Sequence, residues 1–298
     1  MSDHVKGLLI TALGVLFVSP DSLLIRLADL DLWTLAFWRG VFQAAGMTLV
    51  LLCFYGRRTA QVFLAIGATG ILIALIFAVS TFTFVAAIQH TKVSNALVLL
   101  ATAPFFAAIL SRILLKEPVA LRTWAAMTAA VFGVVLIEWD SLGAGTLFGD
   151  AMALATALLF GLKIELLRAR KSINMIPAMV LASVLYALIA LPLAAPGAAG
   201  QTQLLWLLLM GLAVLTPATV LITLGPRYLA APEVALLILL ETVLGPFWVW
   251  LALSEAPSPL GLLGGALVVA SLAVHAALSL RAERRTVAIA TSEASDGR

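Results

Sequence analysis

The sequence predicts an all-α membrane protein with ten transmembrane helices, arranged as two inverted five-helix repeats. First, its 298 residues are 63% hydrophobic and only 11% charged, whereas soluble domains are about 45–50% apolar and about 25% charged. Second, apolar runs of the roughly 20 residues that span a bilayer recur almost without pause from Lys6 to Arg281. Third, the second half of the chain repeats motifs of the first.

Each predicted helix is an apolar run that ends at turn-forming or charged residues. In chain order the predicted helices are 5–27, 32–55, 62–88, 93–115, 119–139, 147–170, 174–195, 203–225, 230–253 and 258–280. The connections, such as Gly56–Gln61 and Ser254–Pro257, are all short, so little room is left for an extramembrane domain. We predict one repeat over residues 1–140, the other over 141–281, and a disordered cytoplasmic tail over 282–298, where apolar periodicity is absent.

The positions of lysine and arginine predict the orientation, because cytoplasmic loops carry an excess of both. With the N-terminus in the cytoplasm, only Arg26 and Lys92 fall on the outer side. The 14 residues on the inner side are Lys6, Arg57, Arg58, Arg112, Lys116, Arg122, Arg168, Arg170, Lys171, Arg227, Arg281, Arg284, Arg285 and Arg298. Both chain ends are therefore expected in the cytoplasm.

The internal repeat appears when the second half is shifted by 138 residues. The stretch Pro104–Glu117 then resembles the stretch that ends at Glu255, and Ala103 corresponds to Glu241. In the first helices of the halves the offset is 142 residues, with Gly7 corresponding to Gly149 and Arg26 to Arg168. Because each half has an odd number of spans, the halves must be inverted. Such repeats place a solute site at their interface near the bilayer midplane and permit alternating access.

Several short motifs resemble a known family. They are Phe37–Trp38–Arg39, Ala103–Pro104, Lys116–Glu117, and Leu240–Glu241 with Ser254–Glu255. The chain resembles the EamA type of the drug/metabolite transporter superfamily, and within it the YddG-type amino acid exporters. The family's usual proline after the ninth-helix glutamate is Thr242 here, with Pro246 one turn on. The resemblance implies a bacterial inner-membrane exporter of aromatic or neutral amino acids and related small metabolites.

Ionisable residues inside the predicted spans are candidate site residues, because each costs roughly 2.5–3.5 kcal/mol to insert and so needs a partner or a water-filled cavity. Asp21 and Arg39 lie at similar depths and could form an ion pair that locks the helix packing or an outer gate. Glu165 is a further candidate for such a gating or ion-pair role. Lys163 could meet a substrate carboxylate or could instead snorkel toward the inner boundary. Glu241, near the middle of its helix, could meet an ammonium group.

The remaining predicted substrate contacts are apolar or aromatic side chains in the spans. They are Ala78, Phe82, Leu99, Trp38 and Trp248. His275, near the inner end of the tenth helix, is a further ionisable residue in the membrane.

Other classes of function are disfavoured by missing motifs. The sequence has no GxSxG or HExxH motif, its three histidines are far apart, and one cysteine cannot form a disulfide or a thiolate metal cluster. We therefore predict no catalytic residue, no metal and no cofactor, although a membrane-embedded enzyme is the rival class. A Walker loop is absent, so ATP hydrolysis is not expected, and proton coupling and facilitated movement both stay open.

The expected partners are the lipid bilayer and a small amphipathic solute, with no nucleic acid. The alternative cargo is a drug or another metabolite. A monomer is expected, with a dimer as the alternative.

Overall fold

The structure, a computed structural model, describes residues 2–91, 93–143, 146–254 and 258–296. Every regular element in these ranges is a helix. The first half holds α1 (Asp3–Val18), α2 (Asp21–Ala28), α3 (Leu32–Tyr55), η1 (Gly56–Arg58), α4 (Thr59–Ala65), α5 (Gly67–His90), α6 (Val93–Leu100), α7 (Ala103–Leu110), η2 (Ser111–Leu115), α8 (Leu121–Glu138) and η3 (Trp139–Ser141).

The second half consists of α9 (Leu147–Ala169), α10 (Ile176–Ala190), η4 (Pro196–Ala198), α11 (Gln201–Leu208), η5 (Leu209–Leu215), α12 (Thr216–Leu224), η6 (Gly225–Arg227), α13 (Ala231–Ile238), α14 (Glu241–Leu253) and α15 (Pro259–Asp296). Nine stretches of the described chain are long and apolar enough to cross a membrane. The shorter apolar helix α10 occupies the remaining predicted position. The predicted membrane fold is therefore confirmed. Residues 62–65, which were predicted as the start of the third span, belong to the separate helix α4.

Several spans are broken into two helices. The first span breaks at Ser19 and Pro20, the fourth at Ala101 and Thr102, and the ninth between α13 and α14. Proline lacks a backbone N–H and ends a helix, which explains the first break. The ninth span has no proline at its break; its Pro246 lies farther along, inside α14. Non-helical backbone at membrane depth is tolerated only inside protein or beside water, so these breaks mark the interior of the bundle.

Equivalent helices of the two halves run antiparallel against each other. Thr34, at the start of α3, accepts a hydrogen bond from Ala195 beyond the end of α10. Tyr55, at the end of α3, accepts one from Asn174 before the start of α10. In the same way, Gly133 of α8 lies against Gly264 of α15 so closely that a Cβ at Gly133 would be 2.8 Å from the Gly264 carbonyl oxygen. Small residues allow such close helix contacts in membranes.

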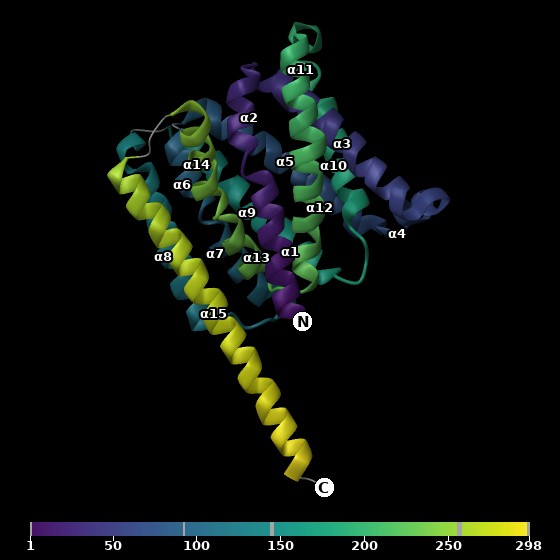
Figure 1. The fold of residues 1–298 in the computed structure, drawn as a ribbon. Helices are drawn as coiled ribbons and strands as arrows, with labels where there is room; N and C mark the ends of the chain where they lie inside the picture. The colour runs from purple at the N-terminus through teal and green to yellow at the C-terminus, as the bar shows by residue number, and fades with distance from the viewer. Residues whose placement is uncertain (1, 92, 144–145, 255–257, 297–298) are drawn as a thin grey trace.

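Other helix contacts also pair a helix of one half with a helix of the other half. Helix α5 packs on α9, and its counterpart α12 packs on α1. Helix α6 packs on α9, and its counterpart α13 packs on α1; helix α7 also packs on α9, and its counterpart α14 on α1. The chain therefore forms two five-helix units of opposite orientation that share one interface (Figure 1).

The local backbone repeats with the predicted offset of 138 residues. Helices α7 and α14 begin at Ala103 and Glu241, and α8 and α15 begin at Leu121 and Pro259. Between them, Lys116 and Ser254 both adopt the left-handed conformation, with φ of 56° and 58°. The alignment of the two halves by sequence is therefore correct over their last two spans.

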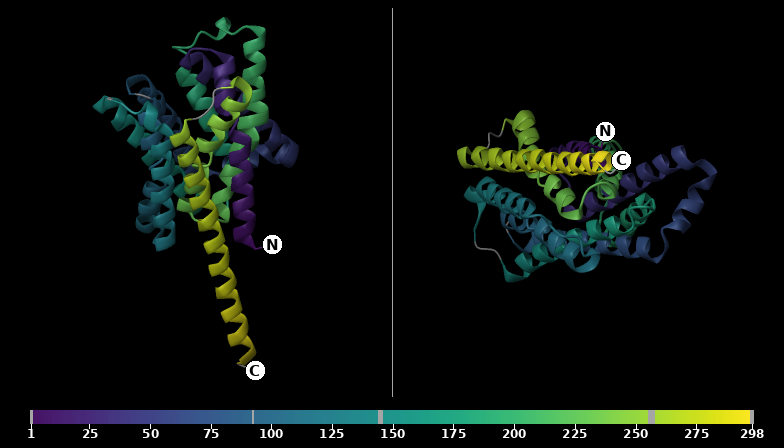
Figure 2. Two further views of the ribbon diagram at one scale, coloured as in Figure 1. Left: turned by 60° about the vertical axis from the view of Figure 1, so that its left-hand side comes forward. Right: turned by 90° about the horizontal axis from the view of Figure 1, so that it is seen from below.

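Both chain ends lie at one end of the bundle, which we name the N-terminal face (Figures 1 and 2). Helix α15 runs to Asp296 and extends beyond the other helices there. It thus enters the segment 282–298, for which a disordered cytoplasmic tail stays a prediction. Alanine, glutamate and arginine in this segment are good helix formers.

Candidate functional site

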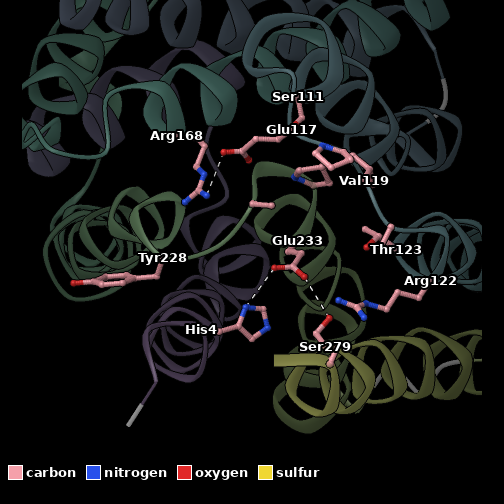
Figure 3. A pocket seen from close by; sticks show the side chains of 15 residues that line it. His4, Ser111, Glu117, Val119, Arg122, Thr123, Arg168, Tyr228, Glu233 and Ser279 are labelled. Atoms are coloured by element: carbon pink, nitrogen blue, oxygen red, sulfur yellow. Dashed lines mark hydrogen bonds and ion pairs between the residues drawn. The ribbon is translucent and has the colours of Figure 1, made fainter. Parts of the chain in front are cut away.

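A polar cavity of about 430 Å³ lies between the two halves at the N-terminal face (Figure 3). Helices α1, α8, α9, α13 and α15 and the turn after η2 all contribute to its wall. Its charged and hydroxyl lining consists of His4, Ser111, Glu117, Arg122, Thr123, Arg168, Glu233 and Ser279. Because these groups come from both repeats, any movement between the repeats changes the shape of the cavity.

Arg168 joins the halves on one side of this cavity. Its Nη2 lies 3.3 Å from Oε1 of Glu117, which follows the fourth span. Its Nη1 donates to the carbonyl oxygen of Pro226 at 3.1 Å. Behind this pair lies Glu165, which is fully buried, has no hydrogen-bond partner for either carboxylate oxygen among the described residues, and interacts electrostatically with Glu117 and Arg168.

Glu233 joins three helices on the other side of the cavity. One of its carboxylate oxygens lies 3.3 Å from Nε2 of His275 and accepts a hydrogen bond from the Ser279 hydroxyl at 3.4 Å. The other oxygen lies 3.8 Å from Nδ1 of His4. Figure 3 shows that this group and the Glu117–Arg168 pair point toward the same space.

A second polar cluster lies at the helix breaks, where Asp21 is buried and Arg39 and Glu241 are half-buried. Asp21 and Glu241 are the first residues of the half-helices α2 and α14, where the helix dipole favours a negative charge. Arg39 of α3 is the cation of this cluster: its Nη2 is 2.9 Å from Oδ2 of Asp21, and it also interacts electrostatically with Glu241. The ion pair that the sequence suggested is thus present, and Glu241 belongs to the same cluster.

Hydrogen bonds next to this cluster join α3 to two more helices. Tyr186 of α10 donates its hydroxyl to Oε1 of Gln43 at 2.6 Å, and Gln43 of α3 donates from Nε2 to Thr219 of α12 at 2.7 Å. Tyr186 also interacts electrostatically with Arg39. Buried polar groups need such partners, and here the partners come from both repeats.

Lys163 of α9 is held by aromatic rings. Its Nζ lies 4.3 Å from the ring centre of Phe77 and 4.2 Å from that of Phe160, a geometry in which the ring faces attract the cation. Phe77 in turn contacts Tyr186 edge to face, with ring centres 6.3 Å apart. Lys163 therefore sits beside the polar cluster and is buried, with 7% of its surface exposed, instead of snorkelling to the boundary.

The other predicted contacts lie in helix interfaces. Ala78 is buried in α5, Phe82 is half-buried on the same helix, and Leu99 packs against alanines of α5, α6 and α9. The indole N–H of Trp248 donates to the Ser19 hydroxyl at 2.8 Å, and that of Trp38 donates to the carbonyl oxygen of Pro196 at 3.3 Å. Both tryptophans thus tie the two repeats together.

A second cavity, of about 640 Å³, lies between α14 and α15 on the outside of the bundle. Its lining is mainly apolar and includes Phe247 and Trp250. None of the predicted substrate residues Ala78, Phe82, Leu99, Lys163, Glu241, Trp248 and Trp38 lines either of these two cavities. Their contact with substrate stays a prediction, and Glu255 of the repeat motif lies outside the described residues.

Sequence reasoning missed several polar residues of the N-terminal cavity as site candidates. Glu233 lies within the ninth predicted span and was available as an ionisable residue in the membrane. Arg122 and Ser111 sit close to the turn between the fourth and fifth spans, and Arg122 is counted only among the basic residues of the inner side. No linear signal connects these three positions, because the fold alone brings η2, α8 and α13 together around the cavity.

Comparisons with known proteins agree with this arrangement. Residues 5–139 match the family model of the EamA-like transporter family. A solved crystal structure that carries no descriptive name superposes with a TM-score of 0.75 at 17% sequence identity, covering 92% of this chain and 99% of the other, which is a likeness of fold. No curated protein sequence matches the chain significantly. The first five-helix unit is thus similar to EamA-like transporters, and the second unit repeats it in the opposite orientation.

Proposed function

We propose that the protein is a secondary transporter of the EamA type, which moves a small amphipathic metabolite along the interface between its two repeats. The observation that carries this proposal is the polar cluster of Asp21, Arg39 and Glu241 at two helix breaks inside the bundle. Charges inside a membrane bundle are costly and mark solute or ion pathways. Broken helices beside such charges are typical of transporters built from inverted repeats.

Amino acids are the proposed cargo. Glu241 would meet the ammonium group, Lys163 the carboxylate, and Ala78, Phe82, Leu99, Trp38 and Trp248 the side chain. Alternating access would require the tryptophan contacts of Ser19 and Pro196 to break when the far face opens. Asp21 and Arg39 would act as a gate, with Glu165 as a further gating group. The alternative cargo is a hydrophobic drug, which the apolar cavity beside Phe247 and Trp250 favours.

The proposed orientation puts the N-terminal face in the cytoplasm of a bacterial cell. The cavity at this face is lined by Arg122 and Arg168, and Lys6 and Arg227 lie at the helix ends beside it. This matches the excess of basic residues in cytoplasmic loops. Fusions at the C-terminus test it: fluorescent protein should be active and alkaline phosphatase inactive, and the reverse pattern would refute it.

Counterflow in proteoliposomes tests the transport proposal. The purified protein is assayed with labelled amino acids, quaternary ammonium dyes and sugars, and the recovered solute is analysed to show that it is chemically unchanged. Uptake of amino acids is expected. Movement of dyes alone would refute the amino acid cargo, and a converted product would favour the enzyme.

Substitution of Glu241 tests the role of the polar cluster. Glu241→Gln should lower counterflow at least tenfold without loss of expression, because the amide cannot hold a cation as a carboxylate does. Asp140→Asn is the matched control, since Asp140 is exposed in η3. Equal uptake by Glu241→Gln and the control would remove Glu241 from the pathway.

A further inference from the structure

We infer that the polar cavity at the N-terminal face is a binding subsite for a carboxylate group, with the guanidinium of Arg122 as its cationic anchor. The subsite would hold the transported solute at this face of the bundle before or after it passes the polar cluster. The inference rests on the proposed transport function and adds to it a second place of contact with the solute.

Three residues that line this cavity carry buried donors without partners. The hydroxyl of Ser111 is buried, with 1% of the residue exposed, and it has no hydrogen-bond partner among the described residues. The same is true of Nε of Arg122 and Nε of Arg168. All three residues line the cavity. Buried polar groups are normally satisfied, so these three donors require an acceptor that the chain itself does not provide.

The charges around the cavity favour an anion. Glu117 is paired with Arg168, and Glu233 is shared by His275, His4 and the Ser279 hydroxyl. Arg122 has no ion pair within the described part of the chain. The two carboxylates that line the cavity are therefore paired, whereas the guanidinium of Arg122 is available to an anion. The unpaired carboxylate of Glu165 is fully buried and does not line the cavity.

The start of α8 adds to the same attraction. Ala120 caps this helix without a side-chain hydrogen bond, and Val119, Ala120, Arg122 and Thr123 all line the cavity. Unpaired backbone N–H groups and the helix dipole at a helix start bind anions. The guanidinium fork of Arg122 fits the two oxygens of a carboxylate, and about 430 Å³ is enough space for a small metabolite.

Binding of matched solute pairs tests the subsite. Titration calorimetry on the full chain, in nanodiscs without anionic lipid, compares phenylacetate with phenylacetamide and L-phenylalanine with L-phenylalaninamide. The carboxylates should bind at least tenfold more tightly than the amides. Arg122→Gln should weaken carboxylate binding roughly ten- to hundredfold, as expected for a lost charge-assisted hydrogen bond, while Arg122→Lys should restore part of it.

The control is Arg112→Gln, because Arg112 is exposed and does not line the cavity. Ser111→Ala should weaken carboxylate binding severalfold and leave the binding of the amides unchanged. In counterflow, Arg122→Gln should raise KM for a transported carboxylate and leave kcat within about twofold, as expected when a binding contact is lost.

Three results would overturn the subsite: equal affinity for acids and amides, wild-type affinity in Arg122→Gln, or phosphatidylglycerol as the only anion whose binding depends on Arg122. Each of these leaves the transport proposal intact if wild-type counterflow persists. Absence of counterflow for every solute, with carboxylate binding still dependent on Arg122, would instead refute transport and keep the subsite.

Discussion

Replacement of Arg39 by glutamine should destabilise the protein strongly. The guanidinium lies 2.9 Å from Asp21 and also interacts with Glu241, so its loss leaves the buried carboxylate of Asp21 and the half-buried carboxylate of Glu241 without a cation. Breaking a buried pair by removing one partner costs about 3–5 kcal/mol. Asp21→Asn should cost less, about 1–3 kcal/mol, because Arg39 keeps Glu241 as a counter-charge. The double variant should then cost less than the two single variants together.

Thermal unfolding of the purified protein in detergent measures these costs. At roughly 2–4 °C per kcal/mol for a chain of this size, Arg39→Gln should lower Tm by roughly 6–20 °C. Arg57→Gln, at an exposed position, is the matched control. A Tm within 2 °C of the wild type, a figure taken as roughly the smallest resolvable shift, would refute the reasoning, as would strictly additive effects in the double variant.

Three further changes probe other parts of the fold. Gly40→Val should lower Tm, because a Cβ at Gly40 would lie 2.7 Å from the Cβ of Ala187 and overpacking costs about 1–3 kcal/mol. The control Gly197→Ala should leave Tm unchanged, because Gly197 faces open space. Equal Tm values for the two variants would contradict this. Asp31→Ala should cost about 1 kcal/mol as a lost helix cap. Hydrogen bonds from Thr34 hold the pKa of the Asp31 carboxyl below its usual 3.8. The difference in Tm between the wild type and Asp31→Ala should therefore persist at neutral pH and vanish as the pH falls through the lowered pKa. A difference in Tm that is independent of pH would argue against this. Lys163→Met should keep or raise Tm, since the buried cation has only ring contacts to offset its desolvation. The same variant should reduce amino acid counterflow. A large fall in Tm would show that the ring contacts outweigh the cost of desolvating the cation.

The sequence predicted the membrane fold because its signals are local. Long apolar runs must become helices in a bilayer, where every backbone group needs an internal partner. An odd number of spans per repeat then requires inversion, and the offset of 138 residues placed Lys116 opposite Ser254, where the backbone does repeat. The pairing of Asp21 with Arg39 followed from their equal depth in neighbouring spans.

What the sequence determined by itself is therefore the number and approximate bounds of the spans, the inversion of the two repeats, and the rarity of charges within the spans. The tertiary structure decided which charges meet. It joined Glu241 to Arg39 across the two repeats, placed Lys163 over aromatic rings, and assembled Arg122, Ser111 and Glu233 around one cavity. The physical reason is that span signals depend on neighbouring residues along the chain, whereas a site between inverted repeats depends on helix packing, which brings together positions far apart in sequence.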